Sequence, residues 1–251
     1  MPFYSLSKQE RTEAVAKISD SIKEDLNKNR LQNIISFFSD EDTYIRKAGY
    51  LSVGKIYFLN EKLQPQIIHT LETLLQNDDF KIRQTVINAA GEIGKADFEN
   101  VPHFFDKGLF DKHHSVRNAV IGSLKKMGDV NPVLVLKWAK LYLHHSDKEI
   151  RREICHGIEL RGRKHPQDIL PLLKELQFDK TARVRNTLVH VLGQISYKKG
   201  CLETLIKELL TWENKQLVTD ALEEIIDVHY RYRNFSALTQ EEAREYISRL
   251  F

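Results

Sequence analysis

The chain has 251 residues and a net charge of +3, and its 41% hydrophobic and 29% charged residues suit a protein with a core and a large soluble surface. Six prolines and eleven glycines are few for this length, which disfavours an all-β fold with its many turns. No apolar run approaches the roughly 18 residues that a membrane-spanning helix needs, and the first ten residues do not resemble a signal peptide.

The N-terminal segment is predicted to be a capping helix within residues 1–30. Ser7 and Glu10 have the spacing of a capping box, in which a hydroxyl and a carboxylate three residues later satisfy free backbone N–H groups. The helix should run to about Asn27. Its apolar stripe consists of Val15, Ile18, Ile22 and Leu26.

Six two-helix units follow over residues 31–229. Their first helices are expected at Leu31–Phe38, Pro65–Leu75, Val101–Phe110, Pro132–Leu143, Pro166–Leu176 and Leu202–Trp212. Each of the first five second helices begins with an apolar residue followed by an arginine, and these arginines are 37, 34, 34 and 34 residues apart. A glycine or serine near the end of most second helices is expected to stop the helix: Gly94, Gly128, Gly162 and Ser196.

The last 22 residues, 230–251, are predicted to form a C-terminal cap. Thr239 and Glu242 form a second capping box, and Tyr246, Ile247 and Leu250 lie on the apolar side of the helix that it begins.

A helical period near 34 residues predicts a stacked solenoid. The second helices open with Asp-x-x-x-x-[Val/Ile]-Arg, as in Asp111 to Arg117 and Asp179 to Arg185. This pattern resembles the HEAT and HEAT-like repeat family. The resemblance implies an all-α fold, a right-handed α-solenoid of about six repeats in a single domain spanning residues 1–251.

The recurrent arginines are Arg46, Arg83, Arg117, Arg151 and Arg185. They could bind phosphates, but their strict recurrence beside a core residue favours a structural ladder in which each arginine pairs with an aspartate or a carbonyl of the inter-repeat turns.

A polar ribbon is predicted one residue after each arginine and at intervals of four residues, because positions i and i+4 share a helix face. Stacked second helices would line the concave side of the solenoid, so this ribbon is either a partner-binding groove or a solvated face. Its binding candidates are Lys47, Asn118, Lys126, Arg152, His156, Asn186 and His190.

Charge is unevenly distributed along the chain. Residues 111–199 contain 18 Lys and Arg against 9 Asp and Glu, a balance of +9, whereas both flanking segments are acidic. A basic loop containing Arg161, Arg163 and Lys164 lies in the middle of this segment. The asymmetry indicates an anionic partner, either DNA backbone or an acidic protein.

Metal, cofactor and disulfide chemistry is not expected. The histidine pairs His113-His114 and His144-His145 lack a third ligand at suitable spacing. Two cysteines, Cys155 and Cys201, are too few for a disulfide framework. We therefore expect a cytoplasmic monomer without a cofactor.

Residues 131–209 resemble the HEAT-like DNA alkylation repair family, through Asn131-Pro-Val-Leu-Val-Leu, Ile150-Arg-Arg-Glu and Val184-Arg-Asn-Thr-Leu. The resemblance implies either excision of alkylated purines, which needs an acid in the concave groove, or binding of branched DNA without excision. His156 and His190 stand where an acid would be needed, so no catalytic residue is assigned. A non-catalytic scaffold that holds DNA backbone is the preferred hypothesis, with a DNA glycosylase or a protein-interaction scaffold as alternatives.

Overall fold

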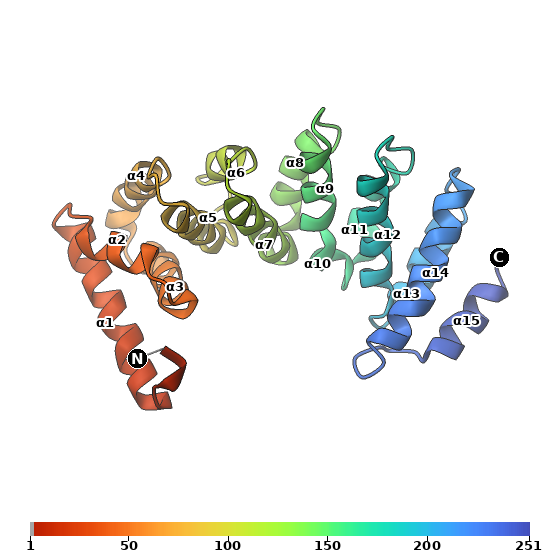
Figure 1. The fold of residues 1–251 in the computed structure, drawn as a ribbon, viewed down its shortest axis with the longest axis horizontal. Coiled ribbons are helices and arrows are strands. Elements are labelled where there is room, and N and C mark those ends of the chain that lie inside the picture. Colours follow the sequence, from red (N-terminus) through yellow and green to blue (C-terminus); the bar gives the residue numbers. More distant parts are fainter. Residues whose placement is uncertain (1–2) are drawn as a thin grey trace. The chain divides into compact units, whose positions relative to one another are not determined.

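The computed structural model describes residues 3–251, and these residues form helices joined by turns, with no β-strand among them (Figure 1). Met1 and Pro2, which belong to the predicted N-terminal cap, lie outside the described residues. The predicted all-α fold of HEAT-like two-helix repeats is confirmed. Within residues 3–251, every helix is too short or too polar to span a bilayer.

Each repeat pairs a first helix with a second helix. The first helices are α2 (Gln32–Ser39), α4 (Gln64–Leu74), α6 (Pro102–Gly108), α8 (Pro132–Tyr142), α11 (Pro166–Lys174) and α13 (Cys201–Leu209). The second helices are α3 (Thr43–Leu59), α5 (Phe80–Gly94), α7 (His114–Val130), α9 (Lys148–Gly157) with its continuation α10 (Glu159–Gly162), α12 (Ala182–Ser196) and α14 (Lys215–Arg231).

Helix α1 (Lys8–Asn27) precedes the repeats, and helix α15 (Gln240–Ser248) follows them. Two short 3-10 segments, η1 (Phe3–Ser5) and η2 (Glu61–Leu63), complete the secondary structure of the described chain. Both predicted capping boxes are present, at Ser7 and at Thr239. The helix boundaries therefore follow the polar signals of the sequence closely.

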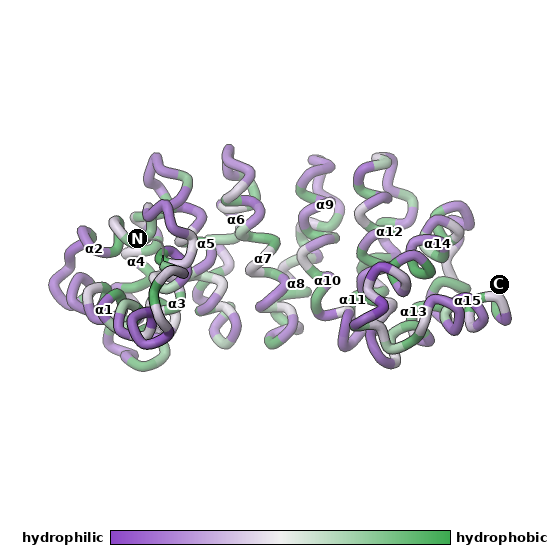
Figure 2. The backbone as a smooth tube through the Cα atoms, turned by 60° about the horizontal axis from the view of Figure 1, so that its bottom comes forward, coloured by the Kyte–Doolittle hydropathy of each residue, from purple (hydrophilic) through white to green (hydrophobic). Residues whose placement is uncertain are grey.

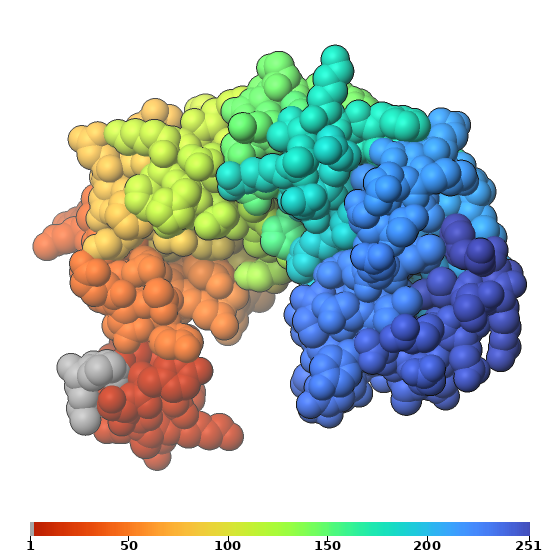
Figure 3. Space-filling model, turned by 45° about the vertical axis from the view of Figure 1, so that its right-hand side comes forward, coloured from red at the N-terminus to blue at the C-terminus, as the bar shows by residue number. Residues whose placement is uncertain are grey.

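The chain divides into two compact units, Met1–Ser123 and Leu124–Phe251. Within the first unit, α3 packs between α1 and α5, and within the second unit, α12 packs between α9 and α14 (Figure 1). The second helices of each unit thus lie side by side. In the space-filling view, the teal and blue parts of the second unit, which contain α12 and α14, adjoin one another (Figure 3).

Aspartates at the turns begin several of the second helices. The side chains of Asp42, Asp79 and Asp147 each accept a hydrogen bond of 2.8 Å from the backbone N–H two residues later. A carboxylate at this position satisfies a free N–H group and interacts favourably with the helix dipole. The turns between paired helices are accordingly hydrophilic, whereas each helix alternates between hydrophilic and hydrophobic residues (Figure 2).

The core is formed by the apolar stripes of the helices. In α12 the whole predicted stripe is buried, and its members are Val184, Leu188, Val191, Leu192 and Ile195. Burial of each such side chain contributes about 1.5–3 kcal/mol before the entropy cost of ordering is subtracted. Cys155 and Cys201 are buried and form no disulfide.

The predicted helix stops lie at or near the ends of the second helices. Helices α5, α10 and α12 end at Gly94, Gly162 and Ser196, and α7 ends at Val130, two residues after Gly128. The only glycine with a left-handed backbone among residues 3–251 is Gly200, with φ of 76°. At Gly193, by contrast, a Cβ atom would lie 2.6 Å from Cγ of Glu224 on α14. The absence of a side chain therefore allows α12 and α14 to approach closely.

Candidate anion-binding surface

The five recurrent arginines all donate from Nη1 to backbone carbonyls of their own turns. Arg117 reaches the carbonyl of Asp111 at 2.7 Å, and Arg185 reaches that of Asp179 at 2.6 Å. The equivalent contacts of the other three involve the carbonyls of Asp40 and Glu41 for Arg46, of Asn77 and Asp78 for Arg83, and of His145 and Ser146 for Arg151.

Two of these arginines also reach the next repeat. Arg83 donates to both carboxylate oxygens of Asp111 at 2.7 and 3.0 Å, and Arg151 does the same to Asp179 at 2.5 and 3.1 Å. These side chains are largely buried, so their hydrogen-bonding capacity is used within the protein. They are poor candidates for contacting a partner.

Four of the predicted binding residues come together in the second unit. Arg152 and His156 of α9 face Asn186 and His190 of α12 across a hollow of about 460 Å³, which Arg183 and Thr187 also line. We call this site the α9–α12 hollow and define it by these six residues. Their proximity follows from the packing of α9 on α12, because corresponding positions of two adjacent second helices lie side by side.

The two arginines at the hollow contact two acids, one of which they share. Glu149 lies 2.9 Å from Nε of Arg152 and 3.2 Å from Nε of Arg183, and Glu153 lies 3.4 Å from Nη2 of Arg152. The side chain of Arg183 is 63% exposed, whereas that of Arg152 is 20% exposed. Arg183 is therefore the more available cation.

A charged network lies beneath the hollow. Nζ of Lys125 is 2.8 Å from Nε2 of His156 and 3.1 Å from Oε2 of the buried Glu159, and Arg163 also pairs with Glu159. Burial raises the pKa of Glu159, but the hydrogen bond with His156 and the charges of Lys125 and Arg163 outweigh it and lower that pKa to about 2. Glu159 is therefore ionised at neutral pH and holds cations of the protein.

Three groups of this network have the chemistry of metal ligands. One ligand atom each of His156, Glu159 and His190 lie within 4.8 Å of one another, a donor set that suits zinc. The ammonium group of Lys125 already contacts two of these three residues. A metal ion would have to displace this cation, so the network is better described as an internal ion cluster.

The predicted basic loop is used within the second unit. Arg161 binds the carboxylate of Asp168 at 2.7 Å and the carbonyl of Asp129 at 3.1 Å. Lys164 binds the carboxylate of Asp129 at 2.8 Å. Arg163 binds Gln194 and the hydroxyl of Tyr197 in addition to Glu159. These three residues lie outside the α9–α12 hollow.

The remaining predicted residues are dispersed over other helices. Lys126 and Asn118 are exposed on α7, and Lys47 lines a different groove in the first unit. On α14 the predicted polar ribbon carries a negative charge. Glu224 lies 3.8 Å from Nδ1 of His190 and pairs with Arg231. The position of α14 that corresponds to His190, 34 residues later, therefore carries an acid in place of a donor.

Sequence reasoning missed Arg183 and Thr187 at the hollow and Lys125 beneath it. Arg183 and Thr187 lie three residues before Asn186 and three before His190, which is one helical turn, so a wider stripe of i and i+3 positions would have included them. Nothing local to Glu159 signals its burial, because its helix α10 follows a break at Ile158.

No protein-family model and no curated protein matches the sequence. Two solved structures are similar in fold. AlkD2 from Streptococcus mutans is 17% identical with a TM-score of 0.55, over 78% of this chain and 97% of that one. A structure of crescerin, which uses a TOG domain array to regulate microtubules in the primary cilium, is 18% identical with a TM-score of 0.50, over 77% of this chain and 88% of that one. The chain therefore has the fold of HEAT-like repeat proteins.

Proposed function

We propose that the chain is a non-catalytic HEAT-repeat scaffold that binds DNA backbone at the α9–α12 hollow. One observation carries this proposal: all six residues that line the hollow carry N–H or O–H donors, and none carries a carboxylate. Arginine, histidine, asparagine and threonine are the groups that proteins use to hold phosphate oxygens without reading base sequence.

The ion pairs at the hollow are compatible with such a role. Arg152 contacts both Glu149 and Glu153 and is 20% exposed, whereas the guanidinium of Arg183, which contacts Glu149, is 63% exposed and can reach a phosphate. Binding of phosphates by these cations releases counterions from DNA, so affinity should fall steeply as salt is raised.

The acids near the hollow favour binding over excision. The side chains of Glu153 and Glu159 are each 2% exposed, and both carboxylates contact cations of the protein. An acid that assists base release must reach the substrate. Glu149 and Glu224 are 28% and 21% exposed, but both contact arginines, so each of these four acids is engaged by a cation of the protein. The glycosylase alternative therefore has weaker support at this surface, and the fold alone does not favour it.

Fluorescence anisotropy with labelled duplex and branched DNA at two salt concentrations tests the proposal. Arg183→Glu should weaken binding and reduce the slope of log affinity against log salt by about one, because one phosphate contact is lost. Lys137→Glu is the matched control, since it makes the same charge change at an exposed position on the first helix α8. Affinity that ignores salt, or that Arg183→Glu and Lys137→Glu reduce equally, would contradict the proposal.

A second assay separates binding from chemistry. Methylated duplex DNA incubated with excess protein should release no free alkylpurine. Release that exceeds the protein-free rate would assign an excision activity, and the scaffold proposal would then be wrong.

A further inference from the structure

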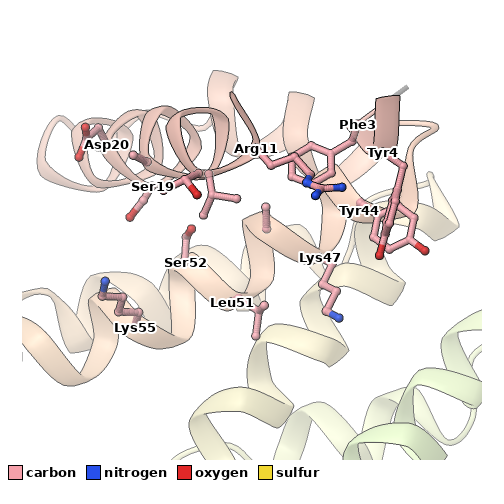
Figure 4. Close-up of a pocket in the computed structure, with 14 residues that line it drawn as sticks. Phe3, Tyr4, Arg11, Ser19, Asp20, Tyr44, Lys47, Leu51, Ser52 and Lys55 are labelled. Atoms are coloured by element: carbon pink, nitrogen blue, oxygen red, sulfur yellow. The ribbon is translucent and has the colours of Figure 1, made fainter. Parts of the chain in front are cut away.

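A groove of about 710 Å³ lies between α1 and α3 in the first unit (Figure 4). We call it the α1–α3 groove. Its walls come from α1, from α3 and from η1, so the whole feature lies within one compact unit. Of the predicted DNA-binding residues, only Lys47 lines it.

The walls of the α1–α3 groove are apolar and partly open to solvent. Val15 continues the apolar stripe of α1, but it is 38% exposed, whereas Ile18 and Ile22 on the same stripe are buried. On the opposite wall Leu51 is 41% exposed. The first turns of α1 therefore present apolar surface that no described residue of the chain fully covers.

One end of the groove is closed by aromatic rings. Tyr4 lies against Tyr44 with ring centroids 4.1 Å apart, and the guanidinium carbon of Arg11 lies 5.4 Å from the centroid of Tyr4 (Figure 4). The backbone N–H of Phe3 donates to Oδ2 of Asp42 at 2.8 Å, which ties this segment to the beginning of α3. The aromatic end is thus anchored by a specific contact.

Positive charge surrounds the apolar walls. Arg11, Lys47 and Lys55 line the groove, and none of them forms an ion pair in the part of the chain that the structure describes. Asp20 is the only acidic residue among those lining it, and it lies at the end opposite the tyrosine pair (Figure 4). Among the described residues, the rim therefore carries three cations without a carboxylate partner, beside the single carboxylate of Asp20.

We propose that the α1–α3 groove is a docking site for an acidic amphipathic helix of a partner protein. Helices lie in such grooves by placing their apolar face between two walls, with residues spaced at i, i+3, i+4 and i+7. Leucine or phenylalanine side chains of the partner would contact Val15, Leu51 and the tyrosine pair. Its glutamates would pair with Lys47 and Lys55.

Duplex DNA fits this site less well, because its surface of sugars and phosphates would leave the apolar walls unpaired.

The test uses a labelled synthetic peptide of about 18 residues, roughly five helical turns, with leucine and phenylalanine on one face and glutamate on the other. A peptide of the same composition in scrambled order is its control. Anisotropy titrations of the full chain should give an affinity for the amphipathic peptide that is about tenfold higher, because only this peptide can bury its apolar residues while its glutamates face the rim.

Variants of the groove localise the binding. Leu51→Asp should weaken binding of the amphipathic peptide about tenfold, and Lys55→Glu about fivefold. Leu59→Asp on the same helix and Lys62→Glu nearby are matched controls, since both residues are exposed and neither lines the groove. Circular dichroism and urea midpoints establish that each variant is folded.

Equal binding of the two peptides would overturn the proposal, as would unchanged affinity in Leu51→Asp. Displacement of the amphipathic peptide by duplex DNA at equal charge concentration would overturn it too, because the groove would then be a general polyanion surface. Arg183→Glu should leave the affinity for the amphipathic peptide unchanged, so failure of the DNA proposal would not affect this one.

Discussion

Arg151 and Asp179 join two successive repeats of the second unit through a two-point contact. Nε and Nη2 of the arginine donate to the two carboxylate oxygens at 2.5 and 3.1 Å. The backbone carbonyl of the same aspartate accepts from Arg185 at 2.6 Å. One residue therefore connects the arginines of two second helices, and Asp111 connects Arg83 and Arg117 in the first unit in the same manner.

Arg151→Ala should destabilise the protein substantially. The side chains of Arg151 and Asp179 are 14% and 6% exposed, so removal of the guanidinium leaves a largely buried carboxylate without its partner. We expect a loss of about 3 kcal/mol in the free energy of unfolding. Urea denaturation followed by circular dichroism measures it. Arg183→Ala, which removes an exposed guanidinium 32 residues later, should change stability by less than about 0.5 kcal/mol; equal effects of the two changes would argue against the ladder.

Acid should weaken the fold over a defined range of pH. Burial raises the pKa of Glu159, Asp111 and Asp179, but cationic partners and hydrogen-bond donors outweigh burial and lower each pKa below its ordinary value. A carboxyl group with a lowered pKa in the folded state stabilises above its unfolded pKa, and this contribution is lost as pH falls through the folded pKa. The urea concentration at the midpoint of unfolding should therefore decrease as the pH is lowered from about 4.5, the ordinary pKa of glutamate, to about 2, the pKa of Glu159 in the folded protein.

The variant Glu159→Gln tests how much of this loss of stability at low pH comes from Glu159. The fall of its pKa from 4.5 to about 2 corresponds to roughly 3 kcal/mol of stabilisation at neutral pH, by the conversion of about 1.4 kcal/mol per pKa unit. The variant should be less stable at pH 7 and should lose less stability between pH 4.5 and pH 2. Urea midpoints across that range measure both quantities. A variant that keeps the full acid response would show that Glu159 does not drive it.

Replacement of two glycines of the first unit by alanine should change the stability of the protein in opposite directions. A Cβ at Gly91 on α5 would lie 2.7 Å from Cβ of Ser123, so Gly91→Ala must push two packed helices apart at a cost of about 2 kcal/mol. A Cβ at Gly122 on α7 would meet no atom within 4 Å. Gly122→Ala should therefore stabilise the protein by about 0.5–1 kcal/mol through better helix propensity. Thermal unfolding of the two variants compares them, and destabilisation by both would contradict the packing described for Gly122.

The repeat organisation could be predicted from the sequence because its signals are local and recur. Capping boxes at Ser7 and Thr239, an apolar stripe such as that from Val184 to Ile195, and the periodic arginines each depend on residues within a few turns of one another. Such signals determine where helices begin and which face they bury. The hollow could be predicted in part, since Arg152, His156, Asn186 and His190 occupy equivalent positions of adjacent second helices.

Whether a charged side chain is free or paired within the protein could not be predicted in this way, because its partners are distant in sequence. Arg161 and Lys164 look like a free basic cluster, yet both pair with Asp129, more than 30 residues away. Lys125 and Glu159, 34 residues apart, form an ion pair only because α7 and α10 meet.

The affinity for DNA should rise as pH is lowered if the α9–α12 hollow holds phosphate. Burial, together with the nearby charges of His156 and Lys125, lowers the pKa of His190, and Glu159 and Glu224 only partly oppose this shift. His190 is therefore mostly neutral at pH 7.5, and a bound phosphate favours its protonated form. Between pH 7.5 and pH 5.5, at constant ionic strength, anisotropy should report affinity rising by about threefold or more. His190→Asn keeps a donor of similar size but cannot gain charge, so it should reduce this rise while leaving affinity at pH 7.5 nearly unchanged. A variant that retains the complete pH response would exclude His190 from the phosphate contact.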